Sequence, residues 1–366
     1  MMRARVNPFF EPGVVAHPGR EGVRAFHRSL PGYSPTALYA CPGLAAALGL
    51  GGLLVKDEST RFGIQSFKAL GAAWAVHRLR ERRPGPLTVS TATAGNHGRA
   101  VAWAARQLGI SAVVFIPAHA APARIDRLRR EAARVELVEG TYDDAVRRCA
   151  ETSATQGWQV VADIGYEGYL EIPPWIAEGY STLFEEAEEQ RLARGYPPPD
   201  VVFIQAGVGG LLHAAVNHYR ACVTQPVLVA VEPVEADALL ASVDAPDGQP
   251  VPATGRQNSI MAGLNCGRVS LTAWPVVRRG VELFVTIEDR FAEDAMRRLA
   301  RPAGTDPAIE AGESGAAGLA AVLALLEAPE LGAAKQFLHL GPARQVVVIN
   351  TEGATDPVGY RRVVGP

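Results

Sequence analysis

Lys68 is the residue whose type and setting most favour chemistry in this chain. Of the 36 Lys+Arg residues only three are lysines, at positions 56, 68 and 335. Lys68 ends the segment 61–68 and is followed by the apolar run 69–76, which predicts a buried helix. Burying an unpaired ammonium is costly, whereas a desolvated lysine can lose its proton and attack a carbonyl. Lys68 is therefore a candidate amine nucleophile; the alternative is a lysine that extends from a helix end to solvent.

A first candidate anion site lies in residues 91–98, between a predicted strand and a predicted helix. Backbone amides at a helix start face outward and favour an anion, and a substrate carboxylate would suit them. Its contacts would be Thr93, Ala94, Gly95 and His97. The alternative is a capped helix, and His97 is either a base or a packed, backbone-bonded histidine.

A second candidate anion site is residues 205–211, which follow a predicted strand and open a helix. Gly207, Val208, Gly209 and Gly210 form a glycine loop whose backbone can close round a phosphate at a helix N-terminus. The loop does not spell GxGxxG, and no acidic residue follows in the required context. A phosphate-ester site is therefore favoured over a dinucleotide site.

Two polar residues follow predicted strands, where α/β folds form ligand crevices. Asp163 follows residues 160–162 and is a candidate general acid or base, or else a turn cap. Thr351 follows residues 346–349 and would meet a ligand or cap its turn. Together, the amine, the phosphate loop, the carboxylate loop, the acid and the hydroxyl match pyridoxal phosphate, an aldehyde that carries a phosphate, acting on an amino acid.

Composition describes a globular chain long enough for two domains, with 366 residues, 48% hydrophobic and 20% charged. The net charge of −2 gives no electrostatic case for nucleic acid or an anionic membrane. Prolines and glycines interrupt the uncharged stretch 37–55, which predicts a short helix and a strand rather than a membrane span. The four cysteines form no CxxC pair, so we expect neither a metal site nor disulfides. This cysteine usage fits a reducing cytoplasm.

Strand-like and helix-like segments alternate along the chain, which predicts parallel sheets covered on both faces. Strands are expected at residues 53–55, 87–90, 112–116, 135–138, 160–162, 201–205, 227–231, 282–285 and 346–349, and helices at 96–108, 123–134, 142–154 and 175–194. The predicted class is α/β, with two open twisted, mostly parallel sheets flanked by helices. Because Lys68 and Gly207 must meet at one cofactor, we expect a large cofactor-binding domain (1–83 and 186–366) and a small domain (84–185).

Motifs spread from about Pro35 to Pro357 carry a resemblance to a known family. They are Lys56–Ser59 with Arg61–Gly63, Ser66–Gly71, Gly95–Arg99 with Val101–Trp103, Glu167–Tyr169 with Ile172 and Pro173, Gln205–Leu211, Met261–Leu264, Glu313–Gly315 and Asn350–Pro357. On these motifs the chain resembles the fold-type II, tryptophan-synthase-β-like pyridoxal-phosphate enzymes, and most closely the diaminopropionate ammonia-lyases. The lysine and glycine motifs mark the wider class; Trp103, residues 167–169 and residues 351–353 point to the ammonia-lyase branch.

The resemblance implies a role for each candidate. Lys68 would bind pyridoxal phosphate covalently, Asn96 would contact its pyridine hydroxyl oxygen, and Gly207–Gly210 would hold its phosphate. Thr351 would face the pyridine nitrogen, and Asp163 matches an aspartate that contacts the distal amine of the substrate. The implied reaction is α,β-elimination of ammonia from 2,3-diaminopropionate, giving pyruvate and ammonia, by a cytoplasmic homodimer.

One departure from the family concerns the substrate isomer. The family usually has an aspartate just before Gly-Asn-His-Gly, assigned as the base for the D-isomer, and here that residue is Ala94. The segment 93–97 thereby resembles serine and threonine dehydratases. We expect the L-isomer to be preferred. A serine/threonine dehydratase, a β-replacement synthase and a non-catalytic amino-acid sensor remain as alternatives.

Overall fold

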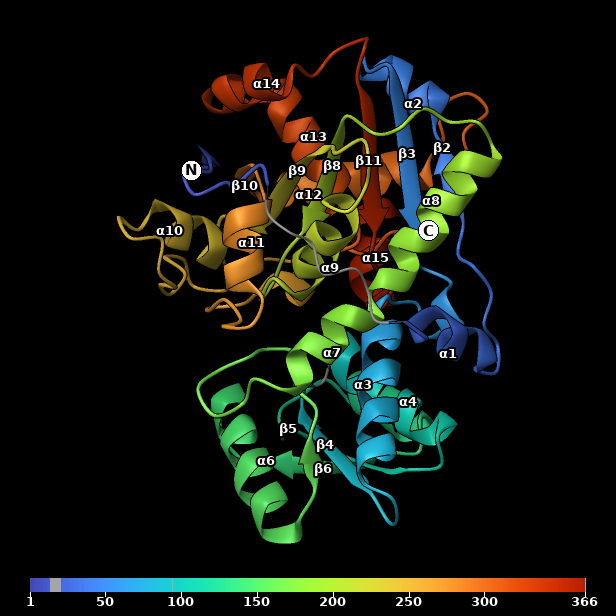
Figure 1. Ribbon diagram of the computed structural model, residues 1–366, viewed down its shortest axis with the longest axis vertical. Helices are drawn as coiled ribbons and strands as arrows, with labels where there is room; N and C mark the ends of the chain where they lie inside the picture. The colour runs from blue at the N-terminus through green and yellow to red at the C-terminus, as the bar shows by residue number, and fades with distance from the viewer. Residues whose placement is uncertain (14–20, 94, 366) are drawn as a thin grey trace.

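The computed structural model describes residues 1–13, 21–93 and 95–365, and it arranges them around two sheets (Figure 1). The larger sheet has seven strands in the order β1-β10-β9-β8-β11-β3-β2, and the smaller has four in the order β6-β5-β4-β7. All pairs are parallel except the edge pairs β1–β10 and β2–β3. The predicted α/β class with two mostly parallel sheets flanked by helices is confirmed.

The strands of the larger sheet are β1 (Ala4–Val6), β2 (Leu38–Ala40), β3 (Gly52–Asp57), β8 (Val201–Gln205), β9 (Val227–Pro233), β10 (Leu283–Ile287) and β11 (Gln345–Asn350). The strands of the smaller sheet are β4 (Thr88–Ala92), β5 (Ser111–Pro117), β6 (Arg134–Val138) and β7 (Gln159–Val160). Central strands of parallel sheets are buried on both faces and read as continuous apolar runs. For that reason β8 and β11 match their predicted ranges closely, whereas the three-residue edge strands β1 and β2 were not predicted.

Helices cover both faces of the two sheets (Figure 1). They are α1 (Val23–Ser29), α2 (Pro42–Ala47), α3 (Lys68–Arg82), α4 (Asn96–Gln107), α5 (Pro122–Arg130), α6 (Tyr142–Gln156), α7 (Ile172–Gly179), α8 (Ser181–Ala193), α9 (Gly210–Tyr219), α10 (Ala238–Asp244), α11 (Trp274–Gly280), α12 (Asp289–Ala300), α13 (Ala317–Glu327), α14 (Gly332–Leu338) and α15 (Pro357–Val364). Short 3-10 turns occupy Arg61–Gly63, Ala262–Leu264 and Pro329–Leu331.

Alternate residues of the larger sheet enter two different hydrophobic layers. In β8, Val202 and Ile204 pack into the layer that contains α3, α4 and α9, while Val201 and Phe203 pack into the layer that contains α12 and α13. This alternation follows from the two-residue period of a strand. The sheet is thereby held between two apolar layers, and the ends of its strands are left to form a site.

The single helix predicted over residues 175–194 is wrong, because the chain forms α7 and α8 on either side of Tyr180. The break lies where this segment meets α3 closely. A Cβ on Gly179 would stand only 2.6 Å from the Leu70 carbonyl oxygen, so only a glycine permits the contact. The break therefore coincides with a close contact between Gly179 and α3.

Helix α3 packs against α4 and α7, beside the smaller sheet (Figure 1). Strands β4 to β7 all lie within residues 84–185, and the strands of the larger sheet lie in the two flanking stretches. The division into domains 1–83 with 186–366, and 84–185, stays a prediction. The packing of α3 favours placing residues 68–82 with the smaller unit.

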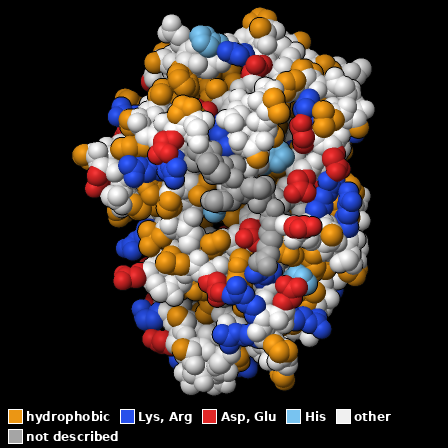
Figure 2. Space-filling view, in the orientation of Figure 1, with side chains coloured by type: hydrophobic (Ala, Val, Ile, Leu, Met, Phe, Trp, Pro, Cys, Tyr) orange, Lys and Arg blue, Asp and Glu red, His pale blue; other side chains and the backbone are white. Residues whose placement is uncertain are grey.

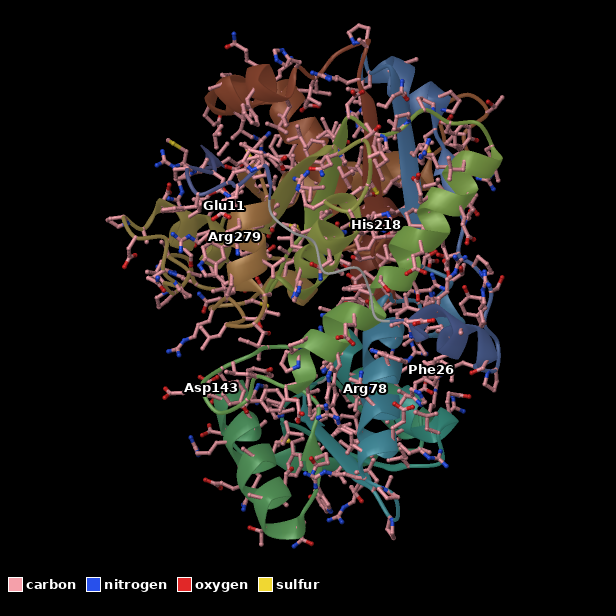
Figure 3. All side chains as sticks on the ribbon, in the orientation of Figure 1. Glu11, Phe26, Arg78, Asp143, His218 and Arg279 are labelled. Atoms are coloured by element: carbon pink, nitrogen blue, oxygen red, sulfur yellow. The ribbon has the colours of Figure 1, made fainter. Side chains whose placement is uncertain are left out.

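The surface mixes acidic, basic and hydrophobic side chains over the face drawn in Figure 2. Near the N-terminus, the Arg279 Nε and Glu11 Oε2 atoms lie 2.8 Å apart and fix the first segment to α11 (Figure 3). No single described helix is both long and apolar enough to cross a membrane; α13 and residues 329–338 meet that test only as a pair bent by 95°.

Candidate active site

A cavity of about 1880 Å³ lies where strands of both sheets end, and it brings the candidate residues together. Its lining includes Lys68, Thr93, Gly95, Asn96, His97, Asp163, Gly207, Val208, Gly209, Gly210 and Thr351. Of the three lysines only Lys68 lines this cavity. Ala94, the remaining predicted contact, lies outside the described residues.

Lys68 is the first residue of α3, and its side chain is 20% exposed. The Lys68 Nζ atom donates a 2.6 Å hydrogen bond to Asp163 Oδ2 and lies 5.1 Å from the centre of the Phe67 ring. Burial lowers the pKa of Lys68, but the ionised carboxylate outweighs burial and holds that pKa above its ordinary value. With Asp163 as its partner, Lys68 is therefore an ammonium and must lose a proton before it can attack.

The turn before Lys68 is held in an unusual backbone conformation. Phe62 (φ 50°) and Gln65 (φ 60°) are left-handed although neither is a glycine. The Arg99 guanidinium donates to the Ile64 carbonyl at 3.1 Å, and the Phe62 and Trp103 ring centres lie 4.5 Å apart. Helix α4 thus holds the turn that positions Lys68.

Asp163 and His97 form a pair of acceptors beside Lys68. The His97 Nε2 atom lies 2.9 Å from the Val161 carbonyl oxygen, which only accepts, so we place the ring proton on Nε2. The other ring atom, Nδ1, keeps a lone pair, lies 3.9 Å from Asp163 Oδ2 and has no hydrogen-bond partner among the described residues. Burial lowers the pKa of His97, which keeps the ring neutral.

Asp163 itself is ionised. Burial raises its pKa, but the Lys68 ammonium 2.6 Å away outweighs burial and lowers that pKa below the ordinary value. The carboxylate and the His97 lone pair therefore present negative and electron-rich atoms on one wall of the cavity, an arrangement suited to a cation.

The predicted carboxylate loop leads into the 12-residue helix α4, which begins at Asn96. Gly95 occupies the N-cap position in an extended conformation, and no side chain caps the helix. The Gly95 amide donates to Thr93 Oγ1 at 3.1 Å. A Cβ on Gly98 would stand 2.1 Å from the Thr93 carbonyl oxygen, so the close turn needs a glycine there. The uncapped amides of this helix start suit a carboxylate.

The glycine loop forms a cradle between β8 and α9. Gly209 is the N-cap of α9 with φ 98°, a left-handed conformation that favours glycine, and no side chain caps the helix. A Cβ on Gly207 would lie 2.8 Å from Cys266 Sγ and 3.3 Å from the Gly263 carbonyl oxygen. A side chain at position 207 would thus fill the space that the glycine loop leaves open. The N-terminus of α9 at this space suits a phosphate. Together with an amine in the same cavity, these residues fit pyridoxal phosphate.

Thr351 follows β11 and stays neutral. Its Oγ1 atom accepts a 3.1 Å hydrogen bond from Gln205 Nε2, which leaves the hydroxyl hydrogen available as a donor.

Among the cavity residues that were not predicted to belong to the site, Glu352 and Tyr180 lie beside predicted ones. Glu352 accepts a hydrogen bond from Asn96 Nδ2 and one of 3.1 Å from the Ser314 amide, while burial raises its pKa. The motif at residues 351–353 included Glu352 without a role. Tyr180 gave no signal, because it lay inside a predicted helix.

Lys56 lies in a separate buried charge cluster of Lys56, Glu58, Arg61 and Glu186. Lys56 Nζ donates to Glu186 Oε2 at 2.8 Å and to the Thr36 carbonyl at 2.7 Å. Two cations and two carboxylates satisfy one another there, as buried charges must. Lys56 is therefore a structural lysine rather than a second candidate nucleophile.

Comparison with known proteins decides the family. The family model described as pyridoxal-phosphate dependent enzyme matches residues 30–353. The chain belongs to this family. The diaminopropionate ammonia-lyase of Escherichia coli is 39% identical to this chain, and that of Salmonella typhimurium is 37% identical to it. The alignments cover 93% of this chain in both cases, and 90% and 91% of the two relatives.

A solved structure of the Escherichia coli diaminopropionate ammonia-lyase, in complex with an aminoacrylate-PLP azomethine reaction intermediate, superposes with a TM-score of 0.91. It is 37% identical to this pyridoxal-phosphate enzyme, and the match covers 100% of this chain and 97% of that one. The resemblance to fold-type II enzymes of the diaminopropionate ammonia-lyase branch is confirmed. The individual roles of the site residues stay predictions.

Proposed function

We propose that this pyridoxal-phosphate enzyme eliminates ammonia from 2,3-diaminopropionate and produces pyruvate and ammonia. The observation that carries this proposal is the pair of acceptors, Asp163 Oδ2 and His97 Nδ1, beside the Lys68 amine. A second ammonium group distinguishes diaminopropionate from serine and threonine, and a buried carboxylate is a suitable partner for it. The two diaminopropionate ammonia-lyases that align over nearly the whole chain support the same substrate.

The proposed cofactor contacts follow from the positions in the cavity. Lys68 would hold pyridoxal phosphate covalently, Gly207–Gly210 would hold its phosphate, and Asn96 and Thr351 would contact its ring. When bound, the cofactor supplies an aldehyde that captures amino groups and a conjugated ring that withdraws electrons from the α-carbon.

The proposed substrate contacts occupy two sides of the same cavity. The Thr93–His97 loop, with Ala94 within it, would anchor the substrate carboxylate at the start of α4. Asp163 would bind the distal ammonium, and His97 Nδ1 would accept a hydrogen bond from the same group.

Proton transfer would begin with a change of partners. In the cofactor-free protein, Asp163 keeps Lys68 protonated. The α-amino group of the substrate would take the place of Lys68 on the cofactor, which would leave Lys68 free beside Asp163. A substrate ammonium at Asp163 offsets that carboxylate, which lowers the pKa of Lys68 and favours the neutral amine. The α-proton then becomes an N–H of Lys68, and the electron pair of the broken C–H bond forms a C=C bond. The distal C–N bond breaks with its pair on nitrogen, and the first ammonia leaves. The released enamine takes up water and hydrolyses to pyruvate and a second ammonia.

We further propose that the L-isomer is preferred. With the carboxylate anchored, the two isomers present their α-protons to opposite faces of the cofactor, and Lys68 serves only its own face. Ala94 carries no proton acceptor where the family has an aspartate.

The deciding experiment measures the release of pyruvate and 2-oxobutanoate from L- and D-diaminopropionate, serine and threonine. We expect L-diaminopropionate to give the highest kcat/KM. A higher kcat/KM for serine or threonine would overturn the proposal in favour of a dehydratase. A cofactor absorption band without turnover of any of the four would indicate an amino-acid sensor.

A homodimer in a reducing cytoplasm completes the proposal. The reducing compartment is supported by four cysteines that are all free, and the homodimer is what the family resemblance implies. Light scattering of the eluted peak in size-exclusion chromatography tests the dimer, and a single-chain mass would overturn it.

A further inference from the structure

Tyr180 carries a buried hydroxyl that faces this cavity without a partner. The residue is 1% exposed, lines the cavity, and its hydroxyl has no hydrogen-bond partner among the described residues. A buried hydroxyl without a partner is costly. The hydroxyl is therefore a candidate partner for a polar group that moves within the cavity.

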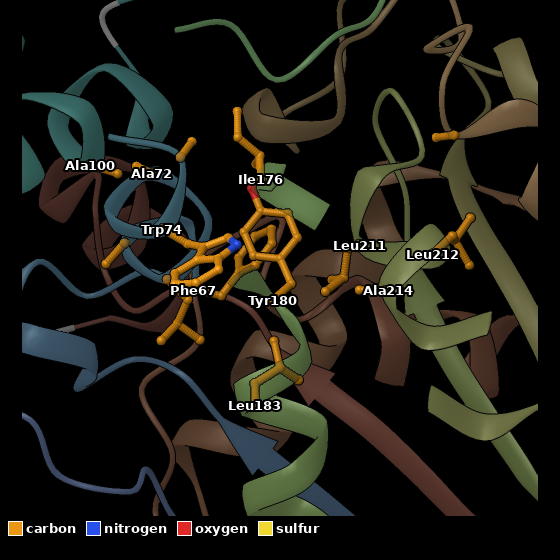
Figure 4. Close-up of a cluster of buried hydrophobic side chains, with 14 of the residues drawn as sticks. Phe67, Ala72, Trp74, Ala100, Ile176, Tyr180, Leu183, Leu211, Leu212 and Ala214 are labelled. Carbon is orange, nitrogen blue, oxygen red and sulfur yellow. The ribbon is translucent and has the colours of Figure 1, made fainter. Parts of the chain in front are cut away.

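The packing around Tyr180 fixes where that hydroxyl lies. Its ring centre is 4.7 Å from that of Phe67, and the two rings lie side by side in the buried cluster (Figure 4). A Cβ on Gly71 of α3 would stand 2.5 Å from Tyr180 Cε1, and a Cβ on Gly210 of α9 would stand 3.8 Å from Cε2. The ring is thus held between α3, which begins with Lys68, and α9, which begins with the glycine cradle.

Lys68 is the amine that faces this tyrosine, and the two groups influence each other's pKa. The Lys68 Nζ atom lies 5.9 Å from the centre of the Tyr180 ring. In the described state the amine donates instead to Asp163, at 2.6 Å. Asp163 is also the residue proposed to bind the distal ammonium, so the amine loses its partner when substrate binds.

We propose that Tyr180 is a positioning residue whose hydroxyl becomes the hydrogen-bond partner of Lys68 once the substrate's distal ammonium occupies Asp163. The inference rests on the proposed function for the identity of the group that occupies Asp163. The hydroxyl accepts from the ammonium form of Lys68 and donates to the neutral amine, so it holds Lys68 in place in both states. Burial raises the pKa of Tyr180, which keeps the phenol neutral throughout.

Four groups surround the Lys68 amine and must be separated in any test. Asp163 is the only one that carries charge; His97 is neutral, and burial raises the pKa of Cys266 to about 12, so its thiol is neutral too. Tyr180 is the fourth. When the charge of Asp163 is removed, Tyr180 should become the principal partner of the amine.

The test compares Tyr180→Phe in two backgrounds, with Asp163 intact and with Asp163→Asn. The full-length protein is stripped of cofactor, and its reaction with pyridoxal phosphate is followed by absorbance as a function of pH, because only the neutral amine reacts. With Asp163 intact, the midpoint should stay unchanged. In the Asp163→Asn background, Tyr180→Phe should lower the midpoint, because the hydroxyl bonds the ammonium more strongly than the neutral amine. The shift should be at most about 1–2 pH units, the full worth of one hydrogen bond to a charged group.

Tyr219→Phe is the matched control, because Tyr219 is a buried tyrosine of α9 that does not line the cavity. It should shift neither midpoint. Equal shifts from Tyr180→Phe in both backgrounds, or none in either, would overturn the proposal. The loading series contains no diaminopropionate, so it decides the role of Tyr180 separately from the substrate.

A second measurement covers the case in which Asp163→Asn fails to fold. Tyr180→Phe alone should lower kcat for L-diaminopropionate by about tenfold or more, as expected for one hydrogen bond to a charged group. KM and cofactor affinity should change less than about twofold. An unchanged kcat, in an enzyme that does turn over diaminopropionate, would overturn the role of Tyr180.

Discussion

Lys68 Nζ and Asp163 Oδ2 lie 2.6 Å apart, so the proposed nucleophile and the proposed binding group for the leaving amine are partners of each other. Each holds the other in its charged form, since the pKa of Lys68 is raised and that of Asp163 is lowered. A substrate with two amino groups replaces both halves of this pair, because one ammonium takes the carboxylate while the other amine reacts with the cofactor. The arrangement ties activation of the lysine to arrival of the diamino substrate.

Replacement of Lys68 tests its assignment as the cofactor lysine. Lys68→Ala should abolish the cofactor–lysine absorption band and turnover. Lys56→Ala should keep that band in whatever fraction folds, because Lys56 lies in the buried charge cluster and not in the cavity. Borohydride reduction followed by peptide mapping identifies the modified residue. A label on Lys56 or Lys335 would contradict the assignment.

Asp163→Asn removes the charge proposed to bind the distal ammonium. Turnover of diaminopropionate should fall roughly ten- to a hundredfold, the worth of one charge-assisted contact of about 1.5–3 kcal/mol. Cofactor affinity should change far less. Asp143→Asn is the control, because Asp143, which is labelled in Figure 3, is exposed although it also lines the cavity. If kcat/KM of Asp163→Asn equals that of the parent, Asp163 is a structural cap.

Gly207→Ala tests the phosphate cradle. The added Cβ would lie 2.8 Å from Cys266 Sγ, and overpacking of this kind costs about 1–3 kcal/mol. Affinity for pyridoxal phosphate, measured by titration of the stripped protein, should fall by about five- to a hundredfold. Cys266→Ala in the same chain should recover part of it. Gly332→Ala, where an added Cβ meets nothing within 4 Å, is the matched control; equal affinities for both glycine variants would remove the cradle from the cofactor site.

Ala94→Asp tests the stereochemical preference. A general base contributes about 10²–10⁴-fold, so the parent should turn over the D-isomer more slowly than the L-isomer by roughly that factor. Ala94→Asp should raise D-isomer turnover more than L-isomer turnover. Comparable rates of the parent on both isomers would mean that another base, such as His97 or a bound water, serves the second face.

Glu186→Gln tests the buried charge cluster behind the site. Glu186 receives hydrogen bonds from Lys56 and from Arg61, and its exposed fraction is 1%. Removal of one partner from a buried ion pair costs about 3–5 kcal/mol, so the free energy of unfolding should fall by that amount in urea. Glu189→Gln on the same helix removes an exposed pair with Arg24 and should cost about 1 kcal/mol or less. Equal losses would show that burial does not decide the cost.

Much of the fold could be predicted because each central strand appears in the sequence as a continuous apolar run. Strand β8 matches its predicted range of 201–205, and helix α6 begins at Tyr142 as expected, where the Thr141 side chain caps it. The break at Tyr180 was not predicted; it lies where Gly179 approaches α3 closely, a contact between segments far apart in the sequence. Strands β1 and β2 are three residues long and carry no period that sequence reading detects.

In the candidate site, too, local features could be predicted from the sequence, whereas contacts between distant residues could not. The local motifs predicted the glycine loop and the start of α4, because each is a strand–loop–helix junction within a few residues. Lys68 was predicted from the rarity of lysine and from the apolar run that follows it. The 2.6 Å contact between Lys68 and Asp163 joins residues 95 positions apart, and the lone pair on His97 Nδ1 depends on its bond to the Val161 carbonyl. Pairings of this kind arise from the packing of the two sheets and have no counterpart in the linear sequence.

The edges of the larger sheet also limit how copies of this chain can associate. At one edge, β1 is short and Arg5, which pairs with Asp244, lies on it. At the other edge, the Leu38 amide of β2 donates to Gln190 Oε1 at 2.9 Å, and the Leu38 carbonyl accepts from Arg194. Side chains of α8 therefore hold the backbone groups that another strand would need. Continuation of one sheet into the next is therefore blocked at the β2 edge, and the short, charged β1 disfavours it at the other edge.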